Sequence, residues 1–195
     1  MSLVAEDQRT RLLSSITRVV GEQGYAATTV ADVVRDAGVS RTTFYEHFAG
    51  KEDCFLRAYR HGMELLDEKV EAAVHDAPAG DWRAQLRAGI LAYLELLAAD
   101  AVTARTYLLE IHHAGEPALA ARTEAMRRFA DRYRASARAA GARAPHPESL
   151  LVLCAGTEQL CAERLRSGGD VRALEDVFML TAEAVLLGAN PPKET

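Results

Sequence analysis

Apolar residues recur at helical spacing along almost the whole chain, and no stretch alternates apolar and polar residues as a half-buried strand would. The first apolar face runs over residues 12–20, and a longer one, from Phe55 to Val74, indicates a helix over roughly 52–76. Glycine and proline separate the later helices. We expect these at about 81–98, 101–113, 117–140, 147–166 and 171–187. The pattern therefore predicts an all-α protein.

Residues 29–38 have the pattern of a short capped helix. Its apolar face consists of residues at i, i+3, i+4 and i+7, namely Val30, Val33, Val34 and Ala37. Thr29 precedes this face and Asp32 follows three residues later, which is the spacing of a capping box. Gly38 stands where the end of a helix favours a left-handed residue. The pattern predicts a helix that begins after Thr29 and ends before Gly38.

A second short helix follows directly. Ser40 can cap it, and Phe44 and Phe48 lie one turn apart on its inner face. Two helices joined by a short turn with glycine, the second polar on its outer face, are the sequence form of a DNA-reading helix-turn-helix. The alternative is an ordinary helical hairpin with a solvated polar face.

The outer face of the second helix carries groups that bind nucleic acid. Hydroxyl and guanidinium groups can bind base edges or phosphates, tyrosine and histidine can donate to phosphates, and Lys51 opens the next helix near the same backbone. Glu46 puts a negative charge on this helix, so it either accepts from a cytosine amino group or tilts away from DNA. The DNA contacts predicted from these residues are Arg41, Thr42, Thr43, Tyr45, His47 and Lys51.

The segment from Thr29 to Phe48, followed by Lys51 and Glu52, closely resembles the helix-turn-helix of the tetracycline-repressor (TetR) family. The resemblance covers roughly residues 8–55 and rests on the Ala-Gly-Val-Ser turn, the Tyr-x-His-Phe end and the Lys-Glu pair. It implies a homodimeric, all-helical transcription regulator, usually a repressor, that a small molecule releases from DNA. By motif position it implies DNA contacts at Thr29, Arg41, Thr42, Thr43, Tyr45, His47 and Lys51, and we also expect one at Ser40. It also implies a core of the DNA-binding domain made of Val33, Val34, Val39, Phe44 and Phe48.

We therefore expect an N-terminal three-helix bundle with the helix-turn-helix over residues 1–51, and a larger helical domain for ligand binding and dimerisation over 52–190. Residues 191–195 would form a C-terminal tail. The resemblance points to the last two helices as the homodimer interface.

The overall charge does not resemble that of a nucleic-acid binder. The formal net charge is −5, and residues 1–53 hold six Lys or Arg against eight Asp or Glu. A basic surface must therefore be local, around Arg41, His47 and Lys51. No segment reaches the about 18 apolar residues of a membrane-spanning helix. We expect a cytoplasmic protein that does not bind a membrane.

The three cysteines fit reduced thiols. Cys154, Glu158 and Cys161 share one helix face, where they either form a soft-metal or thiol-sensing site or simply pack. No motif of a known catalytic, dinucleotide or phosphate site occurs. We therefore expect neither an enzyme nor a cofactor or metal requirement.

These features together predict a ligand-responsive DNA-binding regulator, a repressor released from a palindromic operator of double-stranded DNA by a small apolar effector. Apolar walls with a few polar groups would bind that molecule. The predicted lining is Leu94, Leu97, Tyr107, Ile111, Met126, Phe129, Tyr133 and Glu158. The alternative is a DNA-associated helix-turn-helix protein without a small-molecule ligand.

Overall fold

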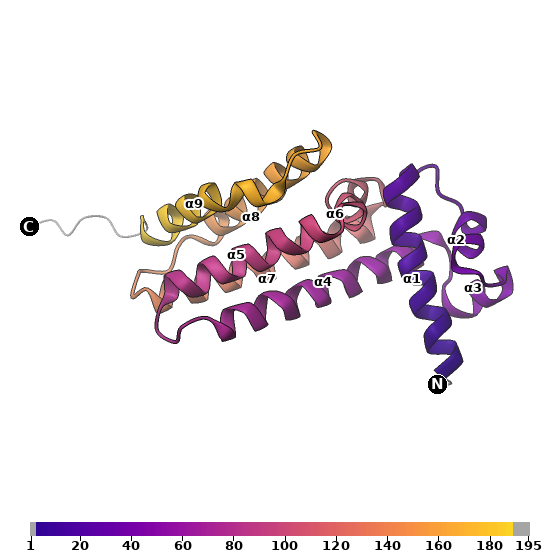
Figure 1. Cartoon of the computed structure of the whole chain (residues 1–195), viewed down its shortest axis with the longest axis horizontal. Helices are drawn as coiled ribbons and strands as arrows, with labels where there is room; N and C mark the ends of the chain where they lie inside the picture. The colour runs from indigo at the N-terminus through magenta and orange to yellow at the C-terminus, as the bar shows by residue number, and fades with distance from the viewer. Residues whose placement is uncertain (1–2, 189–195) are drawn as a thin grey trace, which may run out of the picture. The chain divides into compact units, whose positions relative to one another are not determined.

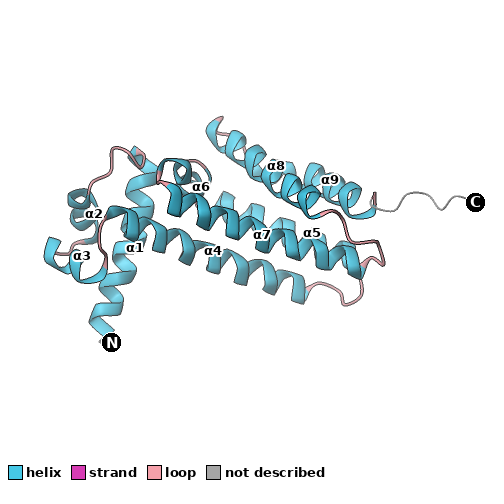
Figure 2. Ribbon diagram, turned by 180° about the vertical axis from the view of Figure 1, so that it is seen from behind, coloured by secondary structure: helices cyan, strands magenta, loops and turns pink. Residues whose placement is uncertain are grey.

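The computed structural model describes residues 3–188, and every regular element in that range is a helix, which confirms the predicted all-α fold (Figures 1 and 2). The elements are α1 (Leu3–Gln23), α2 (Val30–Ala37), α3 (Arg41–His47), α4 (Lys51–Asp76), α5 (Trp82–Ala99), α6 (Ala101–Leu108), the 3-10 helix η1 (Glu110–His113), α7 (Glu116–Ala139), α8 (Pro147–Arg166), the 3-10 helix η2 (Val171–Leu174) and α9 (Glu175–Leu187). Within this range no helix has the length and apolar character needed to cross a membrane. The predicted tail, 191–195, lies outside the described residues.

The chain divides into two compact units. Among the described residues, unit 1 comprises 3–64 and 100–122, and unit 2 comprises 65–99 and 123–188. The predicted domain boundary after residue 51 lies inside unit 1. Unit 1 therefore contains the helix-turn-helix together with the first part of α4, α6, η1 and the start of α7.

Two of the predicted helices are each divided in two. The helix expected over 101–113 ends at Leu108 and continues as η1, because two consecutive residues of η1 have tertiary contacts. The Glu110 carboxylate accepts the backbone N–H of Tyr25 at 2.8 Å, and the next side chain, Ile111, is fully buried. The helix expected over 171–187 likewise begins as η2 before α9.

The core of unit 1 is built around α1, which packs against α2, α3 and α6. Its inner face buries Leu12, Ile16 and Val20 completely. The ring of Phe55, from α4, packs edge-on against Tyr25 with the ring centres 5.0 Å apart. The helix-turn-helix and α6 therefore share one hydrophobic core.

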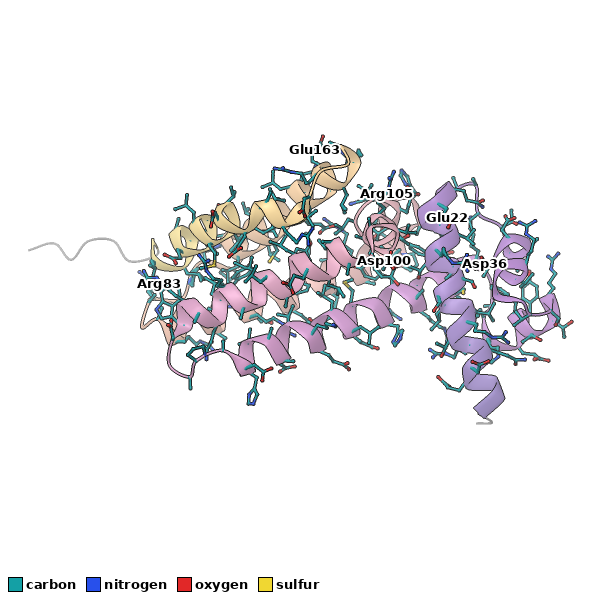
Figure 3. All side chains as sticks on the ribbon, viewed as in Figure 1. Glu22, Asp36, Arg83, Asp100, Arg105 and Glu163 are labelled. Carbon is teal, nitrogen blue, oxygen red and sulfur yellow. The ribbon has the colours of Figure 1, made fainter. Side chains whose placement is uncertain are left out.

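Buried hydroxyl groups join α6 to α1 and α4. The Thr106 hydroxyl donates to the carbonyl of Thr17 at 2.7 Å. The Tyr107 hydroxyl donates to the carbonyl of Ala58 at 2.9 Å and lies 3.0 Å from the Thr17 hydroxyl. Burial raises the pKa of Tyr107 to about 12, so this group remains a neutral donor at physiological pH. Asp100, labelled in Figure 3, caps the start of α6 by accepting two backbone N–H groups.

In unit 2, α5 and α8 each pack against η2 and α9, and both views show α8 and α9 side by side (Figures 1 and 2). Two ion pairs connect the exposed sides of α5 and α9. Arg83, labelled in Figure 3, pairs with Glu183 at 3.2 Å, and Arg87 pairs with Glu175 at 2.9 Å. Exposed pairs of this kind contribute little stability. The buried apolar faces of α5, α8 and α9 therefore hold unit 2 together.

The close approach of α1 and α6 leads to a stability prediction. A Cβ added at Gly21 would lie 2.6 Å from both the Thr106 hydroxyl oxygen and the backbone oxygen of Val102. Because a backbone atom cannot turn away, Gly21→Ala should destabilise the protein by about 1–3 kcal/mol. Glu22→Ala, at the exposed neighbouring position, should change stability by no more than about 0.5 kcal/mol. Equal midpoints for the two variants in urea unfolding would contradict this packing.

Candidate nucleic-acid interface

The capping box predicted for α2 is present. The Thr29 hydroxyl accepts the N–H of Asp32 at 3.3 Å, and the Asp32 carboxylate accepts the N–H of Thr29 at 3.0 Å. The Asp32 carboxylate also accepts the Thr29 hydroxyl at 2.6 Å; this bond, and then the one from the Thr29 N–H, lower the pKa of Asp32, so its carboxylate stays ionised at the positive end of the helix. Gly38 ends α2 in the left-handed conformation, with φ of 64°. Both ends of α2 are therefore set locally, as the sequence predicts.

The orientation of α3 is determined by its cap and by two aromatic side chains. The Ser40 hydroxyl accepts the N–H of Thr43 at 2.9 Å. Phe44 and Phe48 are 0% and 2% exposed. Because a helix turns by about 100° per residue, burial of these rings turns the opposite side of α3 to solvent. The predicted inner face is confirmed.

The solvent side of α3 carries a cation, an aromatic ring and a hydroxyl. Arg41, Thr42 and Tyr45 are exposed, and His47 is half-buried. The Arg41 guanidinium lies over the Tyr45 ring, 5.6 Å from its centre, and donates to the Tyr45 hydroxyl at 3.4 Å. Arginine and tyrosine are thus pre-positioned on one side of the helix, where both can donate to phosphates or base edges.

Lys51 has a structural function that its sequence position does not reveal. Its ammonium group donates to the carbonyls of Tyr25 and Thr28 at 2.8 and 2.9 Å, and lies 4.1 Å from the centre of the Tyr25 ring. Burial lowers the pKa of Lys51. Two of its three N–H donors are therefore used to fasten the loop before α2 to the start of α4.

The predicted DNA contacts consequently differ in how free their side chains are. Arg41, Thr42, Tyr45 and His47 present polar groups on or beside the outer face of α3. Thr29 and Ser40 cap helices, and the hydroxyl of Thr43 lies 2.9 Å from that of Ser40. Contact of any of these residues with DNA stays a prediction.

Two arginines near the motif were not among the predicted contacts. Arg35 extends from α2 with its side chain 76% exposed and pairs with Asp32. Arg18 pairs with Asp36, which Figure 3 labels, and so connects α1 with α2. The i, i+3 spacing of Asp32 and Arg35 is a signal in the sequence. The pair between Arg18 and Asp36 is a tertiary contact without a local signal.

The predicted ligand-binding residues are divided between the two units. Tyr107 and Ile111 belong to unit 1, where Ile111 is part of the hydrophobic core and Tyr107 packs against it. The other six belong to unit 2 and are Leu94, Leu97, Met126, Phe129, Tyr133 and Glu158. The Phe129 ring packs edge-on against Tyr93. Their function as a ligand site stays a prediction.

Around the half-buried Glu158, unit 2 contains the half-buried Tyr93 and the buried Cys154 and Cys161. Burial, and then the neighbouring Cys161 and Glu158, raise the pKa of Tyr93 well above its usual value. Burial raises the pKa of Cys154 and of Cys161 to about 12, so both thiols are protonated and poor nucleophiles. Over the described part of the chain, no three His, Cys, Asp or Glu residues are grouped as a metal site. These properties favour packing over thiol sensing for the two cysteines.

Residues 12–58, which contain the complete helix-turn-helix, match the family model described as "Bacterial regulatory proteins, tetR family". Over this segment the chain is therefore similar to the TetR family. The HTH-type transcriptional activator FasR of Mycolicibacterium smegmatis is 27% identical over 122 residues, which cover 63% of this chain and 54% of FasR. The transcriptional regulator EthR of the same organism is 30% identical over 100 residues, covering 51% of this chain and 46% of EthR.

The similarity of this chain to solved structures extends beyond the motif. The transcriptional regulator FadR of Bacillus subtilis, solved in complex with stearoyl-CoA, superposes with a TM-score of 0.77 at 17% identity. The superposition covers 93% of this chain and 99% of FadR, and it supports the fold alone. Among curated relatives, the chain spans 29% to 54% of the length of the proteins it matches.

The internal bonds of Lys51 generate a second prediction. Lys51→Met keeps the aliphatic stem but leaves the carbonyls of Tyr25 and Thr28 without their donor. The variant should lose about 1–3 kcal/mol of stability in chemical denaturation. Arg41→Met, at an exposed position without a backbone partner in the described chain, should stay within about 0.5 kcal/mol of wild type. A Lys51 variant as stable as the Arg41 variant would show that the ammonium does not fasten the loop.

Proposed function

We propose that the chain is a ligand-responsive DNA-binding transcription regulator, a repressor that inserts α3 into the major groove of an operator. The observation that carries this proposal is the capped α3, held by Phe44 and Phe48 so that Arg41, Thr42 and Tyr45 face outward. A helix of this kind fits the major groove, where side chains distinguish base pairs. FasR and EthR, by their names, are HTH-type transcriptional regulators.

Specificity requires two such helices at a fixed spacing, and we propose that α8 and α9 form a two-fold homodimer. Support comes from large apolar side chains that unit 2 leaves in solvent. Val152 and Leu160 on α8 are 72% and 44% exposed, and Val177 and Leu180 on α9 are 47% and 74% exposed. Val152 and Leu160 are eight residues apart and Val177 and Leu180 are three apart, so each pair lies within about 80° on one side of its helix and forms an apolar outer stripe. Burying both stripes against a symmetry mate would form a four-helix interface.

The opposite faces of the same two helices are already occupied. Leu150, Phe178 and Leu186 are at most 3% exposed and pack inside the single chain. Apolar character on more than one face of α8 and α9 therefore has two explanations, the core of unit 2 and the proposed interface. Substitutions in the exposed stripes therefore test the proposed dimer without disturbing the core of unit 2.

We propose further that a mostly apolar effector binds among the six predicted lining residues in unit 2. Leu94 and Leu97 are buried, and Met126, Phe129 and the polar Tyr133 and Glu158 are half-buried. A few polar groups in an apolar lining can orient a ligand. FadR of B. subtilis was solved with stearoyl-CoA, so long-chain acyl compounds are the first class to test.

The dimer and the operator can be tested together. Wild type should protect a pseudo-palindromic duplex whose half-sites lie one or more turns apart, about 34–36 Å per turn. Leu180→Glu should remain folded, because the side chain is exposed, but should sediment as a monomer and lose protection of the full operator. Leu65→Glu offers a matched control, since this leucine is also exposed, at 48%, but lies on α4. Footprints on single asymmetric sites, or a dimeric Leu180→Glu variant, would overturn the proposed assembly.

The effector can be tested on the complex with operator DNA. Stearoyl-CoA should release the DNA, and Phe129→Ala should raise the concentration needed by about tenfold or more, since truncation removes apolar contact area. Operator affinity without ligand should be unchanged in this variant. If acyl-CoA compounds of all chain lengths leave the complex intact, the alternative of a DNA-binding protein without such a ligand is favoured. Promoter activity should rise when the gene is deleted; a fall would indicate an activator, as FasR is named.

A further inference from the structure

A carboxylate lies at the centre of the outward face of α3. In a helix that turns about 100° per residue, Thr42 and Glu46 each lie about 160° around the axis from the buried Phe44. Both are exposed. Arg41 and Tyr45 lie on one flank of this centre, and His47 lies on the other. Glu46 therefore occupies the part of the helix that is farthest from the core.

Glu46 differs from the acidic residues of the neighbouring helix α2. Asp32 is paired with Arg35 and binds the cap of α2, and Asp36 is paired with Arg18. In contrast, within residues 3–188 the Glu46 side chain makes no hydrogen bond and no ion pair. Its charge is neutralised by no partner inside unit 1, so it must interact with water or with whatever α3 binds.

The position of this charge limits where it can lie on DNA. A carboxylate near a phosphate is repelled, and in a bound duplex the phosphates line the two walls of the major groove, which is about 12 Å wide. The flanking Arg41, Tyr45 and His47 are the side chains directed toward the walls, where they can donate to phosphates. The central Glu46 is directed toward the floor, where it meets base edges.

On the floor of the major groove a carboxylate can only accept hydrogen bonds. The available donors are the N4 amino group of cytosine and the N6 amino group of adenine. Adenine presents the N7 acceptor directly beside its amino group, which repels a second acceptor. Thymine O4 and guanine O6 and N7 are acceptors as well. Cytosine is therefore the base that a carboxylate at this position selects.

We propose that Glu46 is a specificity-determining residue that accepts a hydrogen bond from the N4 amino group of one cytosine in each operator half-site. This inference rests on the proposed function, in which α3 enters the major groove. It assigns to the negative charge on the reading helix the exclusion of the other three bases at that position. The flanking groups supply affinity, and Glu46 supplies discrimination.

Selection of binding sites from random duplex DNA by the whole chain tests this inference. Wild type should enrich sites with cytosine at one position of each half-site, preferred by about tenfold or more. Glu46→Gln should change that preference toward adenine, because an amide both donates to N7 and accepts from N6. Glu46→Ala should reduce the preference to below about threefold at that position alone, because it removes the carboxylate that reads the cytosine.

Two further measurements separate base reading from a general effect of charge. Glu22→Gln, labelled at its α1 position in Figure 3, removes an equal charge from another exposed site and should leave every base preference unchanged. Random-sequence DNA should bind the Glu46 variants at least as tightly as it binds wild type, since a repulsive charge is removed.

The outcomes distinguish this inference from the proposed function. If wild type enriches operator sites and both Glu46 variants enrich the same bases at every position, the inference is overturned while the proposed function stands. If wild type enriches no site, both are overturned. Circular dichroism confirms that the variants, changed at an exposed residue, are folded.

Discussion

Burial of two phenylalanine rings determines what the rest of unit 1 can do. Phe44 and Phe48 are almost fully enclosed, and they leave the seven-residue helix α3 one possible orientation. A helix this short has little stability by itself, because nucleation is costly and few hydrogen bonds follow. The core therefore supplies the stability of α3. The outer face of α3 can then carry tyrosine, threonine and glutamate, whose side chains can bind a partner.

Polar side chains fix the helices and the loop that surround that core. Caps at Thr29 and Ser40 set where α2 and α3 begin, and Lys51 fastens the loop before α2 to α4. The hydroxyl groups of Thr106 and Tyr107 add bonds to α1 and α4. Lys51, Thr106 and Tyr107 satisfy backbone carbonyls that are at least partly buried, and leaving such a group without a partner costs about 1–3 kcal/mol. The polar residues of the motif thus hold α3 in place.

Prediction from sequence succeeded where the cause is local. The helix over 147–166, the capping box at Thr29 and the left-handed Gly38 all depend on residues within one or two turns, and each is found in the structure. Prediction reached its limit where partners are distant in sequence. The inward direction of Lys51 depends on Tyr25, and the break before η1 depends on the bond that the Glu110 carboxylate accepts from the N–H of the same residue.

The ligand-binding residues illustrate the same limit. Apolar periodicity identifies which side chains turn inward, but it does not identify which core they join. Tyr107 and Leu94 were both expected to line one ligand site, yet the structure assigns them to different units. The sequence revealed the residue types on the outer face of α3. The structure added which of these side chains already bind other groups of the protein. On that face, Glu46 is a charged residue whose side chain makes no hydrogen bond and no ion pair within residues 3–188.

Net charge explains why such a protein should bind selectively. With a formal net charge of −5, the chain as a whole repels the DNA backbone, and the cations near α3 are few. Non-specific affinity comes almost entirely from phosphate neutralisation, so it should be weak for this surface. Base contacts must then carry a larger share of the binding free energy. A carboxylate on α3 also increases selectivity, because it lowers the affinity for every DNA sequence that does not present a hydrogen-bond donor to it.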